Sequence, residues 1–321
     1  MRYRAPWWLP GAHLQTIYPS LFLRGRPPAY RRERWRTPDA DFIELDWIDG
    51  PPQAPLAAMF HGLEGSSASH YATALMRAVA ARRWRGVVVH FRGCGGEPNV
   101  LPRAYHSGDA DEVAWILVRL RAMQGAVPLF ATGVSLGGNA MLKWLGREGE
   151  AAAPIVDAAA AVSAPVDLPE AGDRLCRGIN RLYGRHFLRT LKPKSLAKLA
   201  RFPGLYDGER VARARDLRAF DDLVTAPLHG FRDAADYWRR SASKPGLAGI
   251  AVPTLIVHAG NDPFLPGRYL PPPAQVSPAV QIEMTRGGGH VGFTSGPFPG
   301  NVAWLPQRLL AFFAAAPVMR R

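Results

Sequence analysis

The chain has little cysteine and no long apolar run, and each shortage excludes certain classes of protein. Only Cys94 and Cys176 occur among 321 residues, too few for a disulfide framework or a cysteine-built zinc site. The longest apolar stretch, 151–164, is interrupted by Pro154 and Asp157, and a membrane span needs roughly 18–20 apolar residues. The N-terminus has arginines but lacks the apolar segment of a secretory signal. These absences predict a cytoplasmic protein with free thiols.

Acidic residues are also scarce relative to basic ones. The sequence has 26 Asp and Glu against 40 Lys and Arg, which gives a net charge of +14. Of the basic residues 35 are arginine and 5 are lysine. We interpret part of this skew as coding bias. A positive charge suits an anionic partner such as nucleic acid, a membrane surface or an acidic substrate. No nucleic-acid-binding motif accompanies the charge, so we predict no nucleic-acid partner.

The apolar pattern that is present predicts an α/β fold. Strands are expected at 42–48, 54–60, 87–91, 127–131, 155–162, 253–258 and 280–284, and helices at 69–84, 107–123, 139–146 and 302–315. Such alternation favours a mainly parallel sheet covered by helices on both faces. Residues 168–245 are helix-like and basic, without a good strand. We therefore predict one domain over 1–321 with an inserted helical cap at 165–248.

The first 40 residues show little periodicity and are rich in Pro, Trp and Arg. We expect an irregular arm here, with His13 in a structural role. Trp7 and Trp8 have two interpretations. They pack on the main domain, which we prefer, or they touch lipid at a membrane interface, where tryptophan is enriched.

A segment near the middle of the chain carries the strongest functional signal. Gly133-Val-Ser135-Leu-Gly137 stands between a predicted strand and a predicted helix. This is the pattern of a nucleophile elbow, a tight turn that holds the serine in a strained conformation. Side chains at 133 and 137 would clash with the neighbouring strand and helix. The alternative is a glycine-rich turn that only packs tightly or binds a phosphate, although the spacing fits neither a P-loop nor a dinucleotide fingerprint.

Two later loops supply the partners that a serine nucleophile needs. A serine hydroxyl requires a base, and the base requires an orienting acid. Asp262 and His290 each follow a predicted strand, and carboxyl ends of parallel strands meet at one sheet edge. We therefore expect Ser135, Asp262 and His290 to form a catalytic triad, with the glycines before His290 letting the backbone pass close to Ser135. Taken singly, Asp262 could be a turn former and His290 an exposed loop histidine.

A serine nucleophile also needs donors for the oxyanion of its tetrahedral intermediate. We expect one donor to be the Leu136 amide, at the start of the helix after Ser135. The second is expected to be the Leu63 amide, in the glycine-rich loop that follows the strand 54–60. His61 begins that loop, and we interpret it as a structural residue that hydrogen-bonds within it.

Longer motifs around these residues resemble a known family. They are the Gly-Val-Ser-Leu-Gly-Gly-Asn elbow, the His61-Gly-Leu loop, Phe91-Arg-Gly-Cys-Gly-Gly-Glu-Pro, Tyr105-His-Ser-Gly, Pro-Trp-Trp-Leu-Pro-Gly-Ala-His-Leu-Gln-Thr near the N-terminus, Phe220-Asp-Asp-Leu-Val-Thr, Asp262-Pro-Phe and Gly-Gly-His290-Val-Gly-Phe. Together they span nearly the whole chain, which resembles the YheT-like carboxylic ester hydrolases of the α/β-hydrolase superfamily. The resemblance implies the α/β-hydrolase fold and a triad of Ser135, Asp262 and His290.

The resemblance also implies an activity. It points to a serine hydrolase that cleaves carboxylic esters, either short- to medium-chain acyl esters or lipid-like esters, through an acyl-enzyme intermediate. Some members of the family act on phospholipids and some transfer acyl groups to alcohols, so the acyl chain, the head group and the choice between hydrolysis and transfer stay open. A non-catalytic interaction protein that keeps the fold is the alternative from another class. The oligomeric state does not follow from the sequence.

We interpret the other polar residues as structural or as surface residues outside the catalytic site. The nine histidines form no zinc-protease motif, so we predict no metal and no cofactor. The glycine-rich loop 92–97 could shape the mouth of a pocket, but we prefer tight packing of its glycines with Arg92 paired to an acid. We interpret Cys94 as a plain buried thiol. Arginines at 174, 177, 181 and 185 predict a basic amphipathic helix with Leu175, Ile179 and Leu182 on another face. A solvated basic face over a packed apolar one is the default, and contact with anionic lipid or steering of an acidic substrate is the second hypothesis.

Overall fold

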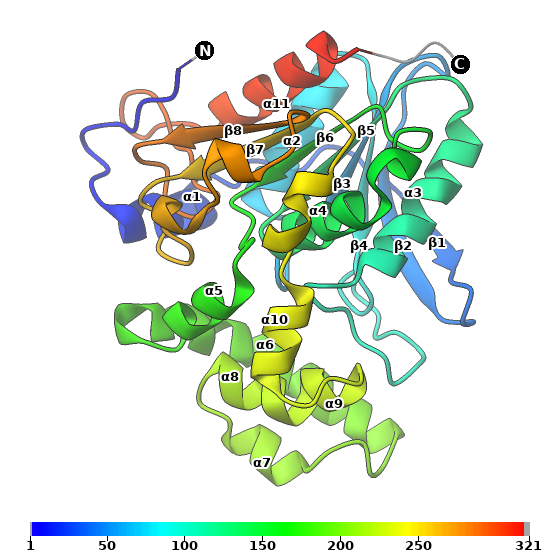
Figure 1. Ribbon diagram of the computed structural model, residues 1–321, viewed down its shortest axis with the longest axis vertical. Coiled ribbons are helices and arrows are strands. Elements are labelled where there is room, and N and C mark those ends of the chain that lie inside the picture. The colour runs from blue at the N-terminus through cyan, green and yellow to red at the C-terminus, as the bar shows by residue number, and fades with distance from the viewer. Residues whose placement is uncertain (1, 318–321) are drawn as a thin grey trace.

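The computed structural model describes residues 2–317. Within that range an eight-stranded sheet has the order β1-β2-β4-β3-β5-β6-β7-β8. The pairs β1–β2 and β2–β4 are antiparallel and the other pairs are parallel. Helices cover both faces of the sheet, and a second group of helices lies beyond one of its edges (Figure 1). The predicted α/β-hydrolase class, with a mostly parallel sheet flanked by helices, is confirmed.

The elements have the following bounds. The strands are β1 (Arg31–Arg36), β2 (Phe42–Ile48), β3 (Leu56–Phe60), β4 (Arg85–His90), β5 (Leu129–Val134), β6 (Ala158–Val162), β7 (Thr254–Ala259) and β8 (Val280–Thr285). The helices nearest the sheet are α1 (Ala12–Phe22), α2 (His70–Ala81), α3 (Ala110–Gln124), α4 (Leu136–Glu148) and α11 (Trp304–Ala315). Among residues 2–317, no helix is long and apolar enough to cross a membrane.

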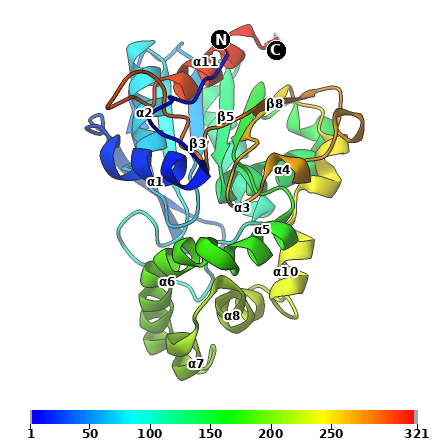
Figure 2. The same ribbon diagram turned by 90° about the vertical axis from the view of Figure 1, so that its left-hand side faces the viewer.

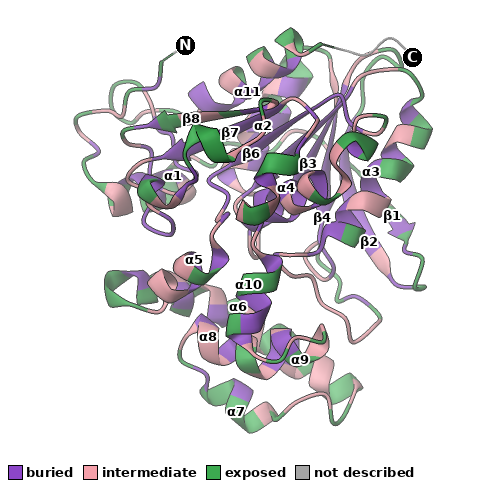
Figure 3. Cartoon of the chain, viewed as in Figure 1, coloured by how far each residue is buried: buried purple, intermediate pink, exposed green. Residues whose placement is uncertain are grey.

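The central strands form the floor between two apolar cores. Every residue of β3, β5, β6 and β7 is buried, as expected for parallel strands covered on both faces. Side chains of α3 and α4, such as Ile116 and Met141, fill one core. Side chains of α2 and α11, such as Met76 and Phe313, fill the other. Figure 3 shows the central strands in the purple of buried residues. This packing fixes the strand ends from which the site loops emerge.

The N-terminal region differs from the irregular arm expected for it. It contains helix α1 and the edge strand β1. In α1 the buried residues are Gln15, Thr16 and Pro19, so its polarity is the reverse of an ordinary amphipathic helix and its periodicity is hard to recognise. In β1 only Trp35 is buried, as befits a charged edge strand. Trp7 is 91% exposed, so the preferred expectation of packing on the domain is wrong for Trp7. It is confirmed for Trp8, whose ring contacts those of Tyr18 and Phe298 at 5.3 and 5.4 Å.

The segment between β6 and β7 is helical throughout its regular elements. It contains α5 (Leu168–Leu175), α6 (Arg181–Arg201), α7 (Gly208–Arg213), α8 (Leu217–Phe220), a π-helical turn at Asp221–Thr225, α9 (Ala226–Leu228) and α10 (Ala234–Ser241). These helices form the lower group in Figure 1. A small apolar cluster around Leu188, Val211 and Phe220 holds them together.

The single basic helix expected through residues 174–185 is wrong. Helix α5 ends at Leu175, and a short 3-10 turn at Gly178–Asn180 precedes α6. Gly178 has φ 51°, a left-handed conformation that ends a helix. Because of this break, Ile179 and Leu182 are 58% and 60% exposed instead of packing under a solvated basic face.

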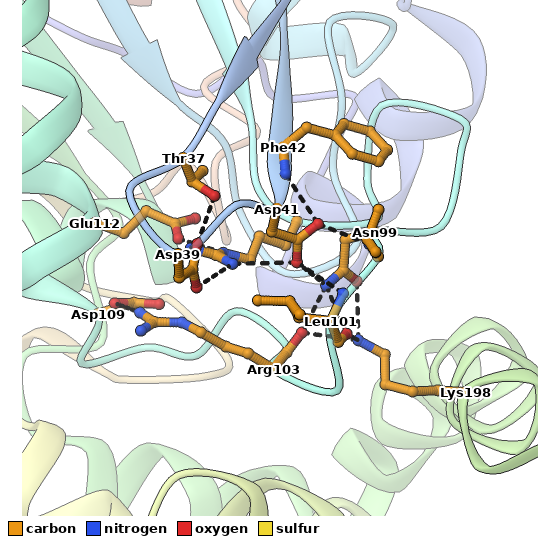
Figure 4. Close-up of polar contacts among 12 residues, drawn as sticks. Thr37, Asp39, Asp41, Phe42, Asn99, Leu101, Arg103, Asp109, Glu112 and Lys198 are labelled. Carbon is orange, nitrogen blue, oxygen red and sulfur yellow. Dashed lines mark hydrogen bonds and ion pairs between the residues drawn. The ribbon is translucent and has the colours of Figure 1, made fainter. Parts of the chain in front are cut away.

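A buried ionic network centred on Arg92 anchors the loop between β4 and α3. Figure 4 labels its acidic partners Asp39, Asp41 and Glu112. The Arg92 guanidinium donates to Glu112 Oε2 at 2.5 Å, to Asp39 Oδ2 at 2.8 Å and to Asp41 Oδ2 at 3.2 Å. Asp41 also accepts a hydrogen bond from Asn99 Nδ2 at 2.7 Å. The expectation that Arg92 pairs with an acid is confirmed, because it holds three carboxylates.

The same loop is tied to the helical segment by Lys198 of α6. Its ammonium donates to Asn99 Oδ1 at 2.9 Å and to the carbonyls of Leu101 and Arg103 at 3.0 and 2.8 Å. Burial lowers the pKa of Lys198 to about 8. Three oxygen acceptors around one ammonium fix α6 against the loop that Arg92 anchors.

Substitution Arg92→Met is expected to destabilise the fold by about 3–5 kcal/mol, because it leaves buried carboxylates without their cation. Urea unfolding measures this loss. Arg213→Met is the matched control, since Arg213 pairs with Glu209 while their side chains are 75% and 80% exposed, and exposed pairs contribute at most about 1 kcal/mol. Equal losses in the two variants would contradict the anchoring role of Arg92.

Candidate active site

Ser135 lies at the sharp turn between β5 and α4, as expected for a nucleophile elbow. Its backbone has φ 51° and ψ −119°, a conformation that is costly for a residue with a side chain. A Cβ at position 133 would lie 2.6 Å from the Gly138 Cα, and a Cβ at position 137 would lie 2.6 Å from the Phe60 carbonyl oxygen. The predicted strain and the predicted need for both glycines are confirmed.

The structure brings Ser135, His290 and Asp262 together. His290 Nε2 lies 2.9 Å from Ser135 Oγ, and His290 Nδ1 lies 2.9 Å from Asp262 Oδ2. With Nδ1–H donating to the carboxylate, Nε2 is left to accept from the serine hydroxyl. The Asp262 side chain is fully buried and that of His290 is 10% exposed. Three segments 28 to 155 residues apart thus form one hydrogen-bonded chain.

Asp262 both closes a turn and faces the imidazole of His290. Its Oδ1 accepts hydrogen bonds from the backbone amides of Phe264 at 2.8 Å and Leu265 at 3.4 Å, which closes a turn. Its Oδ2 faces His290. Because the turn fixes the carboxylate, the oxygen that reaches the imidazole is held in one orientation.

The loop that carries His290 rests on α1, a support that the sequence reasoning missed. The His290 amide donates to Thr16 Oγ1 at 2.9 Å, and the Gly288 amide donates to Gln15 Oε1 at 2.8 Å. A Cβ at Gly289 would lie 2.7 Å from Thr16 Oγ1. The glycines before His290 therefore permit a close approach to α1.

An aromatic side chain covers the outer face of the imidazole. The Phe264 ring stacks on His290 with centroids 4.0 Å apart, and the Tyr183 ring of α6 contacts Phe264 at 4.8 Å. Tyr183 also meets His13 of α1, whose Nδ1 lies 3.0 Å from the tyrosine hydroxyl. The expected structural role of His13 thus has a concrete form, a tie between α1 and α6.

The loop after β3 passes directly beside Ser135. A Cβ at Gly62 would lie 3.2 Å from the Ser135 Cβ. The Gly62 amide donates to the Tyr71 hydroxyl at 3.0 Å, and the Glu64 amide donates to the Tyr105 hydroxyl at 2.9 Å. Leu63 lies between Gly62 and Glu64. Within residues 2–317, its amide and the amide of Leu136 donate no hydrogen bond.

His61 is held as a neutral, structural residue. Its Nδ1–H donates to the Gly62 carbonyl at 2.7 Å, and its Nε2 accepts from the Phe91 amide at 3.2 Å. Complete burial lowers the pKa of His61 to about 3. The expectation of a hydrogen bond within its own loop is confirmed.

A cavity of about 470 Å³ opens beside Ser135, between the sheet edge and the helical segment. This lies within the range of roughly 300–1,000 Å³ of small-molecule sites. Its walls include Leu63, Leu136 and Phe264 from the sheet side and Leu168, Leu175, Phe187, Leu191, Phe220 and Trp238 from the helices. The walls are mostly apolar, so they suit a hydrocarbon chain more than a polar ligand.

One ion pair spans the cavity from the sheet side to α6. Lys194 Nζ lies 2.8 Å from Glu64 Oε2, and the Tyr105 hydroxyl donates to Glu64 Oε1 at 2.8 Å. Glu64 has φ 54°, an uncommon conformation for a non-glycine residue. The pair therefore links the position of α6 to the backbone next to Leu63.

Cys94 is a poor candidate for a second reactive centre. Burial raises the pKa of the Cys94 thiol to about 12, and a protonated thiol is a poor nucleophile. Within residues 2–317, no group of three or more His, Cys, Asp and Glu side chains is arranged to hold a metal ion.

Comparisons with known proteins agree with this architecture. A family model described as "alpha/beta hydrolase fold" matches residues 58–297. Among solved structures, the chain resembles a bacterial membrane phospholipase A, with a TM-score of 0.57 and 21% identity over 95% of this chain and 91% of that one. It also resembles an esterase of Exiguobacterium antarcticum, with a TM-score of 0.55 and 18% identity over 88% and 99% of the two chains. At these identities the structural likeness shows the fold.

Two sequence relatives are closer. "Phospholipase ABHD3" of Mus musculus is 29% identical over 94% of this chain and 79% of its own length. "Putative esterase YheT" of Escherichia coli (strain K12) is 43% identical over 92% of this chain and 88% of its own length. From this identity and the matching family model, the chain belongs to the α/β-hydrolase family and, within it, to the YheT-like group that its motifs resemble.

Proposed function

We propose that this protein is a serine hydrolase that cleaves carboxylic esters through an acyl-enzyme intermediate on Ser135. The observation that carries the proposal is the position of the His290 imidazole, 2.9 Å from both the Ser135 hydroxyl and the Asp262 carboxylate. Membership in a family with members named as esterase, phospholipase and lipase supports the same reaction class. A non-catalytic protein would have no need of a strained, partly exposed serine next to an oriented imidazole.

The proposed reaction has two halves. Ser135 Oγ attacks the ester carbonyl while His290 Nε2 takes the hydroxyl proton, and the imidazolium then gives that proton to the departing alkoxide. In the second half, His290 removes a proton from water, and the resulting hydroxide attacks the acyl-enzyme. The carboxylic acid leaves as Ser135 recovers its proton. Asp262 orients the imidazole and stabilises the imidazolium in both halves.

The amides of Leu63 and Leu136 are the proposed oxyanion donors. Leu136 opens α4, so its N–H belongs to the positive end of a helix that begins next to Ser135. Leu63 lies in the loop that Tyr71 and Tyr105 hold beside the serine. Two fixed N–H groups need no reorganisation when negative charge develops, and one such donor contributes about 10²–10³ in rate.

Residues 165–248 are proposed to act as a cap that selects the substrate. Their helices supply the apolar far wall of the 470 Å³ cavity, and Lys194 and Lys198 tie them to loops of the sheet side. An apolar cavity reached from Ser135 fits the acyl chain of a small-molecule or lipid ester. Transfer of the acyl group to an alcohol is the nearest alternative to hydrolysis. The two reactions are distinguished by whether an added alcohol diverts acyl groups from water.

Substitution Ser135→Ala is expected to abolish turnover of p-nitrophenyl esters, and Asp262→Asn to lower kcat by about 10⁴-fold because the imidazole loses its orienting acceptor. Steady-state kinetics with each folded variant measures both effects. Cys94→Ser is the control and should keep its activity. Turnover by Ser135→Ala at the unmodified rate would refute the nucleophile assignment.

Thr16→Val is expected to lower kcat by up to about 100-fold with little change in KM, because a small displacement of a catalytic group is costly. The substitution removes the oxygen that accepts from the His290 amide at 2.9 Å. Thr16→Ser keeps that oxygen and should keep most of the activity. If valine and serine gave the same kcat, the support of His290 by α1 would have no catalytic role.

The cavity predicts a preference for longer acyl chains than acetyl. Each methylene buried contributes about 0.8 kcal/mol, so kcat/KM should rise by up to about fourfold per methylene until the cavity is full. A series of p-nitrophenyl esters from acetate to laurate measures this rise. A steady fall from acetate onward would show that the acyl chain does not enter the cavity.

A further inference from the structure

Helix α1 has its polar side chains inside and its apolar side chains outside. Gln15 and Thr16 are buried against the His290 loop. Leu14, Ile17 and Leu21 are 52%, 41% and 58% exposed, and their spacing of three and four residues places them on one face of the helix. A soluble helix normally turns such a stripe inward, so the outer face of α1 lacks the protein contact that its composition calls for.

The exposed apolar surface continues on both sides of α1. On one side, the Tyr18 ring of α1 contacts the rings of Phe22 and Trp8 at 5.1 and 5.3 Å. Phe22 and the neighbouring Trp7 are 69% and 91% exposed. On the other side, the His13–Tyr183 hydrogen bond joins α1 to α6, beside the exposed Ile179 and Leu182. Figure 2 shows α1 and α6 on the side of the molecule that faces the viewer.

We call this surface the apolar face and define it by six residues. They are Leu14, Ile17, Leu21, Phe22, Ile179 and Leu182, all between 41% and 69% exposed. Exposed apolar side chains gathered on one side of a protein often mark an interaction site.

The two segments that build the apolar face carry positive charges and no negative ones. The sequence contains no Asp or Glu in residues 2–32 or in residues 174–206, the two segments that build the face. Arg181, Arg185 and Arg189 lie four residues apart along α6 and are exposed. Within residues 2–317 these three arginines form no salt bridge. Arg24 and Arg26 are exposed just beyond the end of α1.

We propose that the apolar face docks on the surface of an anionic lipid bilayer. Aliphatic and aromatic side chains enter the interface between head groups and acyl chains, while the arginines meet lipid phosphates. Tryptophan, as at the exposed Trp7, favours this interface. A second copy of the chain fits poorly, because two faces without acids would repel each other. A nucleic acid would leave the aliphatic stripe in water.

Docking in this way would bring the lipid beside the proposed substrate cavity. The side of α6 opposite its arginine row lines the cavity with Phe187, Leu191 and Lys198. Tyr183 touches Phe264, which stacks on His290. The inference goes beyond ester hydrolysis, since adsorption to a bilayer requires no turnover and is measurable in a protein that cannot react.

The test is co-sedimentation with vesicles of phosphatidylcholine alone and of phosphatidylcholine mixed equally with phosphatidylglycerol. Wild-type protein and Ser135→Ala are compared, so that binding is separated from hydrolysis. One double variant removes apolar contact, Leu21→Ser with Phe22→Ser, and another removes charge, Arg181→Gln with Arg185→Gln. Activity on a water-soluble p-nitrophenyl ester and a urea unfolding curve, measured on each variant, report the fold and the site independently.

Matched control variants come from the α3–α4 side, away from α1 (Figure 1). Val118 and Met123 of α3 are 49% and 58% exposed, and Val118→Ser with Met123→Ser removes a similar apolar area. Arg119→Gln with Arg147→Gln removes the same net charge from that side. A non-specific attraction between a basic protein and anionic vesicles would respond equally to both charge variants.

The expected result is binding of wild type and Ser135→Ala to the anionic vesicles, and much weaker binding to the neutral ones. Each arginine removed from α6 should weaken binding by about fivefold, and Leu21→Ser with Phe22→Ser should weaken it at least as much, while the controls bind as wild type. Absence of binding, or equal loss in test and control variants, would overturn the proposal. So would a wild-type dimer that the Leu21→Ser, Phe22→Ser variant converts to a monomer.

Discussion

The hydrogen-bonded chain from Ser135 Oγ through His290 to Asp262 Oδ2, with 2.9 Å at each step, is the constraint on which the site depends. It exists because β5, β7 and β8 are parallel and end at one edge of the sheet. The core residues that fix the register of these strands therefore also fix the distances within this hydrogen-bonded chain. The strain at Ser135 can persist because Gly133 and Gly137 let β5, α4 and β3 surround it closely.

Around that chain, each loop of the site is held from outside by polar contacts. Thr16 and Gln15 hold the His290 loop, Tyr71 and Tyr105 hold the loop of Leu63, and the Arg92 network holds the loop that Lys198 links to α6. Because α1 and α6 also build the apolar face, the same two helices that support the site would be the ones that meet a bilayer.

The sequence was sufficient for the fold class and for the residues that meet at the sheet edge, since Gly-x-Ser-x-Gly and the strand-end positions of Asp262 and His290 are local signals. It was insufficient where a residue acts through a distant partner. Gln15 and Thr16 contact residues more than 270 positions away, and nothing in their own neighbourhood shows that the polar side of α1 turns inward. The break at Gly178 depends on a single left-handed residue, which periodicity across 174–185 hides. Whether 165–248 acts as a cap stays a prediction.

The most direct test of the account is intact-protein and peptide mass spectrometry after reaction with a fluorophosphonate, which phosphonylates an activated serine. The account predicts one adduct per chain, on Ser135, that forms quickly in the native protein and is lost when His290 is replaced by alanine. A native protein that stays unmodified, or an adduct located on any residue other than Ser135, would contradict it.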